Sequence, residues 1–318
     1  MLALCFDGKV TLRRDCPRPR PGRSEVLVAV HKAGICATDL EVVRGYMGFR
    51  GVMGHEFVGT VVGGSRAWRG KRVVAEINCI CGRCDLCRSG LSDHCRNRTV
   101  LGIDGRDGCF AEYLVVPTRN LHEVPGRIGD AEAVFVEPLA AAFQVARQVK
   151  LSPTDRVVVL GDGRLGQLIV RVLKRSLRRT VMVGRHAAKL EAAEKQGVQT
   201  VLEPDFVAGA DADVVVDATG SPSGLQLAMR AVRPRGTIVL KSTFAAAEGL
   251  DLAPLVVHEI TVVGSRCGPF PAALQALAAG EVDVSALISA EFPLAEGPAA
   301  LEAAGDADHL KVLLDVGQ

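Results

Sequence analysis

Four closely spaced cysteines give the strongest chemical signal in the sequence. They are separated by two, two and seven residues: Cys81, Cys84, Cys87 and Cys95. Four thiolates with no histidine and no open position are typical of a closed tetrahedral zinc site, which stabilises a lobe without taking part in chemistry. Four thiolates can also hold an iron–sulfur cluster, so this metal is the alternative.

A second set of possible metal ligands lies upstream, at Cys36 and at the adjacent pair His55 and Glu56. Thiolate, imidazole and carboxylate are all donors that zinc accepts, and three protein ligands with one exchangeable position define a catalytic zinc. Taken alone, Cys36 would be interpreted as a small buried hydrophobic residue, and His55 as a hydrogen-bonded polar residue. The prediction therefore depends on the whole set.

A glycine-rich turn follows an apolar run that ends at Leu160, and helically spaced leucine, isoleucine and valine follow the turn. This order predicts a strand, a tight turn and a helix, which is the context in which Gly-x-Gly-x-x-Gly binds the pyrophosphate of a dinucleotide. The alternative is an ordinary turn between a strand and a helix. The residues expected at the cofactor are Gly161, Asp162, Gly163, Arg164, Leu165 and Gly166.

The end of the next predicted strand, Thr180–Val183, indicates which cofactor is bound. NAD sites carry an aspartate or glutamate at this point to accept hydrogen bonds from the adenosine ribose. Here the strand is followed by Gly184, Arg185 and His186, with Lys189 one helical turn further on. An arginine can bind a 2′-phosphate through a pair of charge-assisted hydrogen bonds, so we expect NADP(H) rather than NAD(H). The alternative places Arg185 on the adenine or in solvent.

The rest of the chain predicts an α/β protein with a doubly wound parallel sheet, preceded by a segment of strands and loops. A net charge of +2 with interspersed charges gives no reason to expect a nucleic acid or membrane partner. No apolar run is long enough to span a membrane and the opening residues do not look like a signal peptide, so we expect a cytoplasmic protein. In that compartment clustered cysteines bind metal rather than form disulfides.

Together these motifs resemble the medium-chain dehydrogenase/reductase family, in its zinc-dependent alcohol and polyol dehydrogenase branch. The resemblance implies a GroES-like β-rich catalytic domain over residues 1–140 and 270–318, and a Rossmann cofactor domain over residues 141–269. It also implies two zinc ions per chain, a small alcohol or carbonyl substrate, and a homodimer or homotetramer.

By the same resemblance, Cys36 and His55 bind the catalytic zinc and Glu56 is a ligand or a switchable neighbour. Thr38 hydrogen-bonds the substrate oxygen, and Asp39 orients His55. Glu137, in the segment Glu137-Pro138-Leu139-Ala140, supplements the zinc shell; alternatively it only complements a helix dipole. Glu41 stands where relatives often have a proton-relaying histidine, so we hypothesise that it takes that role, with a simple surface carboxylate as the alternative.

The function implied is hydride transfer between an alcohol and a nicotinamide cofactor, with a zinc ion beside the alcohol oxygen and Thr38 accepting its proton. One alternative is a zinc-free quinone or enoyl reductase of the same fold, which the two sets of metal ligands disfavour. The other is a non-catalytic nucleotide-binding redox sensor.

Overall fold

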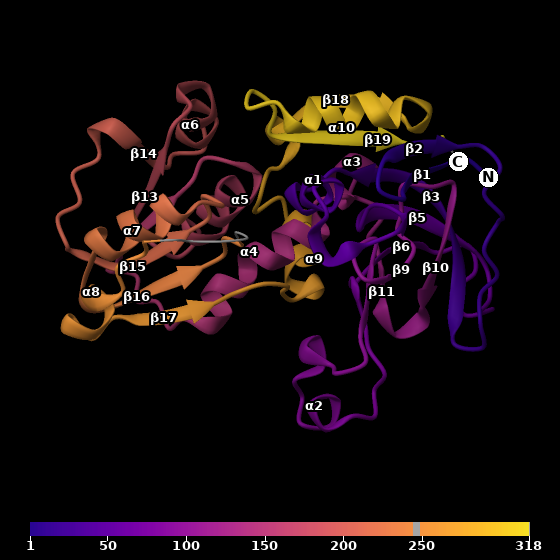
Figure 1. The fold of residues 1–318 in the computed structure, drawn as a ribbon, viewed down its shortest axis with the longest axis horizontal. Coiled ribbons are helices and arrows are strands. Elements are labelled where there is room, and N and C mark those ends of the chain that lie inside the picture. The colour runs from indigo at the N-terminus through magenta and orange to yellow at the C-terminus, as the bar shows by residue number, and fades with distance from the viewer. Residues whose placement is uncertain (244–248, 318) are drawn as a thin grey trace. The chain divides into compact units, whose positions relative to one another are not determined.

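The computed structural model describes residues 1–243 and 249–317, and these form two compact units. The first unit contains residues 1–137, 273–280 and 288–318, and the second contains residues 138–272 and 281–287 (Figure 1). The units differ from the predicted domains at residues 138–140, 270–272 and 281–287, which were expected in the first domain and lie in the second unit. Residues 281–287 are tied to the second unit by Arg171, on one of its helices, which donates a hydrogen bond of 3.1 Å to the carbonyl of Asp283.

The first unit is built on a seven-stranded, mostly antiparallel sheet. Strand β3 is central, because it pairs with β5, β19 and β10. In order the strands are β11 (Leu121–Glu123), β6 (Arg72–Ala75), β5 (Glu56–Gly63), β3 (Glu25–Gly34), β19 (Lys311–Asp315) and β18 (Ile288–Pro293), with β10 (Tyr113–Pro117) also on β3. The C-terminal strand β19 therefore completes a sheet that begins near the N-terminus.

Two small sheets and several short helices also belong to this unit. The sheets are formed by β2 (Val10–Arg13), β1 (Ala3–Phe6) and β4 (Gly51–Val52), and by β7 (Asn78–Cys79), β8 (Thr99–Leu101) and β9 (Gly105–Arg106). The helices include α1 (Ala37–Val43), α2 (Asp85–Arg88), α3 (Asp130–Ala133) and α10 (Gly297–Gly305). Helix α2 lies in a lobe that extends away from the sheet (Figure 1).

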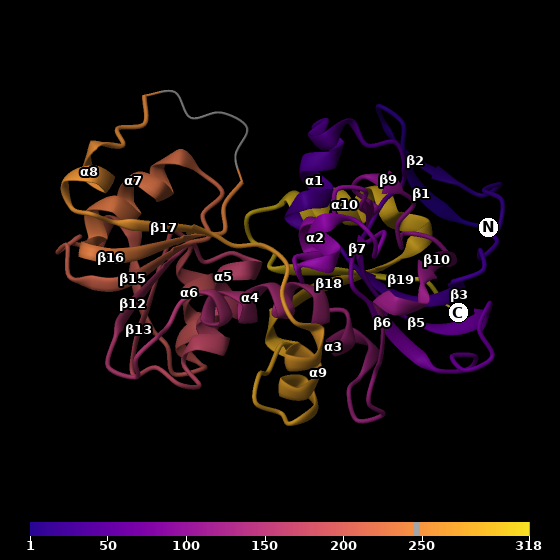
Figure 2. The ribbon, with the colours of Figure 1, turned by 90° about the horizontal axis from the view of Figure 1, so that it is seen from below.

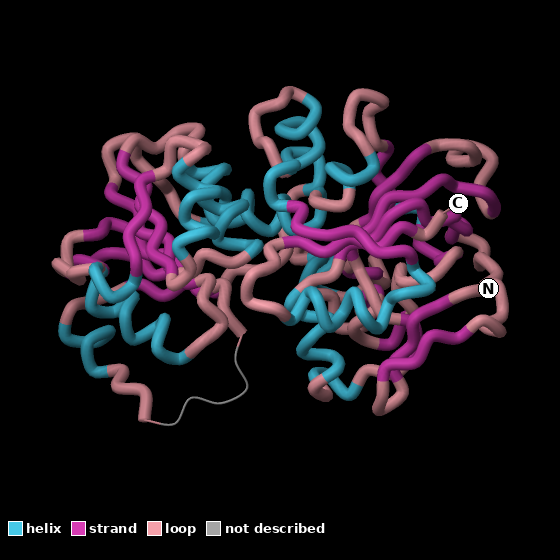
Figure 3. Tube along the Cα trace, turned by 90° about the horizontal axis from the view of Figure 1, so that it is seen from above, coloured by secondary structure: helices cyan, strands magenta, loops and turns pink. Residues whose placement is uncertain are grey.

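The second unit is a six-stranded parallel sheet with helices on both faces, as predicted. Its strand order is β14 (Gln199–Leu202), β13 (Arg179–Gly184), β12 (Arg156–Leu160), β15 (Ala212–Asp217), β16 (Val232–Leu240) and β17 (Thr261–Gly264). This is the order of a doubly wound dinucleotide-binding sheet. Helix α7 (Pro222–Ala231) covers one face, while α5 (Arg164–Leu173) and α6 (Ala187–Glu194) cover the other (Figures 2 and 3).

The three glycines of the predicted turn have three different physical requirements. Gly161 has a φ of 106°, which side chains rarely adopt. A Cβ at Gly166 would lie 2.0 Å from the carbonyl oxygen of Gly161, so only glycine allows α5 to pack this close. A Cβ at Gly163 would meet nothing within 4 Å, so the backbone there is open to a ligand. The turn is therefore built as the motif predicts.

Helix α3 is followed closely by α4 (Val136–Gln148), which places Pro138 in the first turn of α4, where proline is tolerated. Strand β10 begins only at Tyr113, because the Phe110 backbone bonds Leu4 and Met53 instead. Helix α8 (Ala253–Val257) lies in the second unit, and most of α9 (Phe270–Ala278) lies in the first. No helix within residues 1–243 and 249–317 is long and apolar enough to cross a membrane.

Candidate functional site

Cys36 is held where strand β3 turns into helix α1. It is the N-terminal cap of α1, and its backbone N–H donates a hydrogen bond of 2.7 Å to the Asp39 carboxylate. Asp39 is fully buried, so this bond to the first turn of the helix satisfies part of its charge. The sequence Cys-x-x-Asp therefore fixes the Cys36 backbone by a local helix cap.

His55 and Glu56 reach the same place through strand register. In the ladder between β3 and β5, Glu56 lies opposite Gly34, two residues before Cys36. The side-chain ligand atoms of Cys36, His55 and Glu56 all lie within 4.8 Å of one another. The structure thus brings together the three donors that the sequence suggested, and their types fit a zinc ion.

The electrostatics of this cluster favour a histidine hydrogen-bonded to a thiolate. Asp39 Oδ1 lies 3.3 Å from His55 Nδ1, although neither atom has a hydrogen-bond partner of good geometry among the described residues. Burial lowers the pKa of His55, but the Asp39 carboxylate and Cys36 more than reverse this, so its pKa lies well above the usual value. Burial raises the pKa of Cys36, and His55 outweighs it, so the thiol is more acidic than usual.

The sequence analysis did not identify Lys311, which completes the cluster. Lys311 is 2% exposed, and its ammonium forms an ion pair with Glu56, which is 1% exposed. It also donates a 3.3 Å hydrogen bond to the carbonyl of Ile35, and burial lowers its pKa to about 8. Because the Lys311 ammonium neutralises the Glu56 carboxylate, the structure favours Glu56 as a neighbour of the metal rather than as a direct ligand. The signal in the sequence was a lysine within the apolar run 310–314, at the first residue of strand β19.

The other predicted residues of this site, Thr38, Glu41 and Glu137, have different surroundings. The Cys36 thiol lies 3.8 Å from the Thr38 hydroxyl, so Thr38 is beside the predicted metal position. Glu41 is 46% exposed and forms an ion pair of 2.5 Å with Arg44, which favours the surface-carboxylate alternative. Glu137 is half-buried in the first turn of α4 and is not one of the three grouped donors. Its place in the metal shell stays a prediction.

The four cysteines of the α2 lobe form the second cluster, again with all ligand atoms within 4.8 Å of one another. The Cys84 and Cys87 sulfurs are 3.5 Å apart, and so are those of Cys81 and Cys95. Backbone N–H groups of Arg83 and Cys84 lower the pKa of Cys81 to about 6, while burial and the Cys84 thiol raise that of Cys87 to about 12. Four thiols this close cannot all ionise without a cation, so their geometry fits a metal.

The predicted cofactor turn contains a carboxylate that the sequence analysis placed there without a role. Asp162 is 6% exposed, and its Oδ2 accepts hydrogen bonds of 2.7 Å from the backbone N–H groups of Arg185 and His186. The Arg185 guanidinium is engaged by Glu203 through two hydrogen bonds of 2.7 and 2.9 Å. Lys189 is buried, and its place at the cofactor stays a prediction.

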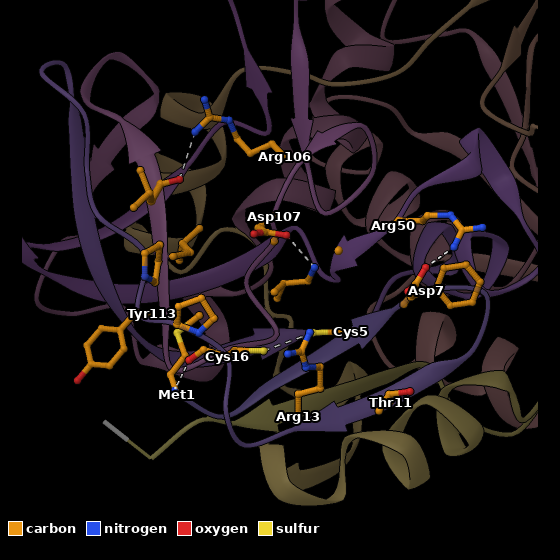
Figure 4. A pocket seen from close by; sticks show the side chains of 18 of the residues that line it. Met1, Cys5, Asp7, Thr11, Arg13, Cys16, Arg50, Arg106, Asp107 and Tyr113 are labelled. Atoms are coloured by element: carbon orange, nitrogen blue, oxygen red, sulfur yellow. Dashed lines mark hydrogen bonds and ion pairs between the residues drawn. The ribbon is translucent and has the colours of Figure 1, made fainter.

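A separate hollow of about 720 Å³ lies at the N-terminal strands of the first unit, and none of the metal-cluster residues lines it (Figure 4). The thiols of Cys5 and Cys16 meet there at 3.8 Å, and burial raises the pKa of Cys5 to about 12. A buried thiol of raised pKa is unreactive at neutral pH. These two cysteines are therefore core residues.

Comparison with known proteins decides the family. The alcohol dehydrogenase GroES-like domain matches residues 22–126, and the zinc-binding dehydrogenase domain matches residues 165–279. The 2-dehydro-3-deoxy-L-galactonate 5-dehydrogenase of Pseudoalteromonas atlantica is 31% identical over 93% of this chain and 92% of its own. The chain belongs to the zinc-dependent alcohol and polyol dehydrogenase branch of the medium-chain dehydrogenase/reductase family.

Solved structures of the family share this fold over the whole chain. The structure of a zinc-binding dehydrogenase from Sinorhizobium meliloti, solved with NADP bound, matches with a TM-score of 0.91 and 29% sequence identity. The match covers 99% of this chain and 98% of the Sinorhizobium chain. An alcohol dehydrogenase from Escherichia coli CFT073 in complex with NADH has a TM-score of 0.90 and 28% identity, covering 99% of both chains. This dehydrogenase is thus an NAD(P)-dependent oxidoreductase, and the zinc-free reductase alternative is not favoured.

The buried ion pair of this dehydrogenase gives a prediction about stability. Lys311→Met leaves the Glu56 charge buried without its partner, which should lower the free energy of unfolding by about 3–5 kcal/mol. The double variant Glu56→Gln with Lys311→Met removes both charges and should recover most of that loss. Denaturant unfolding of the three proteins measures both effects. A Lys311→Met variant as stable as the unmodified protein would show that the pair does not neutralise Glu56.

Proposed function

We propose that Cys36 and His55 hold the catalytic zinc of this alcohol dehydrogenase, with Glu56 beside them and paired to Lys311. The observation that carries the proposal is the grouping of Cys36, His55 and Glu56 within 4.8 Å in a buried setting. A zinc ion, when bound there, supplies the Lewis acidity that makes an alcohol hydroxyl or its carbonyl product reactive.

The protein's own groups then have separate tasks. The half-buried Thr38 hydroxyl next to Cys36 takes up the proton that the alcohol loses while it releases its own hydroxyl proton towards solvent, and the same relay runs in reverse during carbonyl reduction. Asp39 holds the Cys36 backbone and faces the His55 ring, which keeps both donors in place. The substrate class is a small alcohol or polyol and the corresponding carbonyl compound, as for the sugar-acid dehydrogenase relative named above.

We infer that the four cysteines of the α2 lobe hold a second, structural zinc. All four donors are thiols, and two backbone N–H groups stabilise the Cys81 thiolate. Such a closed site leaves no position for a substrate, so its metal supports the fold of the lobe and does not act in catalysis.

Two cysteine variants separate the roles of the metal sites. Cys84→Ser should remove about one zinc per chain and lower the melting temperature, because binding at a structural site contributes to folding. Cys36→Ser should abolish turnover while the fold is retained. Metal analysis, thermal unfolding and alcohol oxidation assays measure these effects, with Cys267→Ser, outside both clusters, as the control.

The control should keep two zinc ions and full activity. One zinc or none in the unmodified protein would contradict the proposal of two sites. A Cys84→Ser protein that keeps two zinc ions would contradict the structural role of the lobe.

We further propose that NADP(H) is preferred over NAD(H). Gly184 carries no side chain that could repel a 2′-phosphate, and Arg185 follows it with a guanidinium that is 58% exposed. The pair between Arg185 and Glu203 lies at the surface, where such pairs contribute about 0–1 kcal/mol. A charge-assisted hydrogen bond to a phosphate contributes about 1.5–3 kcal/mol, so a 2′-phosphate should displace Glu203.

Arg185→Ala tests this assignment. It should raise the Michaelis constant for NADPH by about ten- to a hundredfold and hardly change that for NADH, because only NADPH carries the phosphate. Glu203→Gln is the matched variant: it breaks the charge pair and keeps Arg185, so the NADPH constant should stay equal or fall. Higher catalytic efficiency with NADH in the unmodified enzyme would contradict the preference.

We also propose that the enzyme is a homo-oligomer, as the sequence analysis expected, working in the reducing cytoplasm. Strand β17 is at the edge of the parallel sheet, and the helix before it exposes apolar side chains. The exposed residues are Leu252, Val256, Val257 and Val262, with Val256 80% exposed. Exposed apolar side chains on and next to an open sheet edge support pairing with a second copy. A reducing compartment keeps the metal-binding thiols free.

A further inference from the structure

The glycine turn after β12 packs against the end of β13, and this contact is possible because Gly184 has no side chain. A Cβ built on Gly184 would lie 2.5 Å from both Cβ and Oδ2 of Asp162. No real side chain tolerates that distance, so the Asp162 carboxylate occupies the space in which a side chain at position 184 would begin. Glycine at 184 and aspartate at 162 are therefore a coupled pair, although 22 residues separate them.

The Asp162 carboxylate is bound by three donors of the protein. Oδ2 accepts from the backbone N–H groups of Arg185 and His186, both at 2.7 Å. The His186 ring nitrogen Nδ1 lies 3.0 Å from Oδ1 and 3.1 Å from Oδ2. With an exposed fraction of 6%, the carboxylate is directed to the turn after β13.

An NAD site places its carboxylate on the residue that ends the second strand, where it accepts hydrogen bonds from the ribose. In this chain the carboxylate comes from the glycine turn and approaches the same strand end from the other side. Three donors of the protein bind it, and two of them are the backbone N–H groups of Arg185 and His186. It thus holds the Gly184–His186 turn and is directed to the protein backbone.

We propose that Asp162 is a positioning residue for cofactor choice: by pinning the Gly184–His186 turn, it directs Arg185 to the 2′-phosphate of the cofactor. This rests on the proposed preference for NADP(H), which it explains in structural terms. The coupled pair replaces the carboxylate that an NAD site carries at the strand end.

The first test measures the pair without any cofactor. Gly184→Ala should lower the melting temperature by several degrees, because its Cβ displaces Asp162. In an Asp162→Gly background the same change should cost about 1 °C or less, since both the Cβ and the carboxylate that it would meet are then absent. Gly264→Ala is the control: it ends β17 of the same sheet, and its Cβ would meet nothing within 4 Å. Equal losses in both backgrounds would overturn the coupling, whichever cofactor the enzyme prefers.

The second test measures binding by isothermal titration with ADP-ribose and with its 2′-phosphorylated form. Asp162→Ala should weaken binding of the phosphorylated form about tenfold, and binding of ADP-ribose by less than about threefold. Asp162→Asn keeps a carbonyl acceptor, so its affinity for both ligands should stay within about threefold of the unmodified protein. Exchanging the two residues, Asp162→Gly with Gly184→Asp, should reverse the preference towards ADP-ribose.

The outcomes separate the two proposals. An unmodified protein that binds ADP-ribose more tightly contradicts the NADP(H) assignment, while the unfolding test still decides whether Asp162 and Gly184 are coupled. An unmodified protein that prefers the phosphorylated form, with an Asp162→Ala variant that keeps the preference, leaves the assignment intact and overturns the role of Asp162.

Discussion

The close packing around Gly34 is the constraint on which the candidate active centre depends. A Cβ at Gly34 would lie 2.6 Å from Val134, 2.7 Å from the Glu56 carboxylate and 2.7 Å from Lys311. Gly34 lies opposite Glu56 on one side and Leu313 on the other. The absent side chain therefore makes the room in which Glu56 and Lys311 meet. His55 precedes Glu56 by one residue, and Cys36 follows Gly34 by two. The same register therefore places His55 beside Cys36.

Features encoded over short stretches of chain could be predicted from the sequence. The spacing of the four cysteines is short enough for one loop and helix α2 to bring them together, and the glycine turn follows directly from its three backbone requirements. The parallel sheet follows from alternating apolar strands and amphipathic helices. Grouping Cys36 with His55 required the family resemblance, because neither residue alone predicts a ligand.

Features that depend on long-range register could not be predicted. Lys311 is 255 residues from Glu56, and only the pairing of β19 with β3 brings them together. Asp162 was predicted to touch the cofactor because of its motif, but its contact with the turn after β13 depends on how two parallel strands align. No carboxylate follows β13 in the sequence, and this holds in the structure. The sequence did not show that the neighbouring glycine turn supplies one, Asp162.

The central claim is that two metal sites of different design lie in this chain, one beside Thr38 and one in the α2 lobe. Anomalous diffraction from crystals of the purified protein, recorded on both sides of the zinc absorption edge, tests it most directly. The account predicts two zinc peaks per chain, one between Cys36 and His55 and one among Cys81, Cys84, Cys87 and Cys95. No peak beside Cys36, or a signal at the iron edge among the four cysteines, would contradict it.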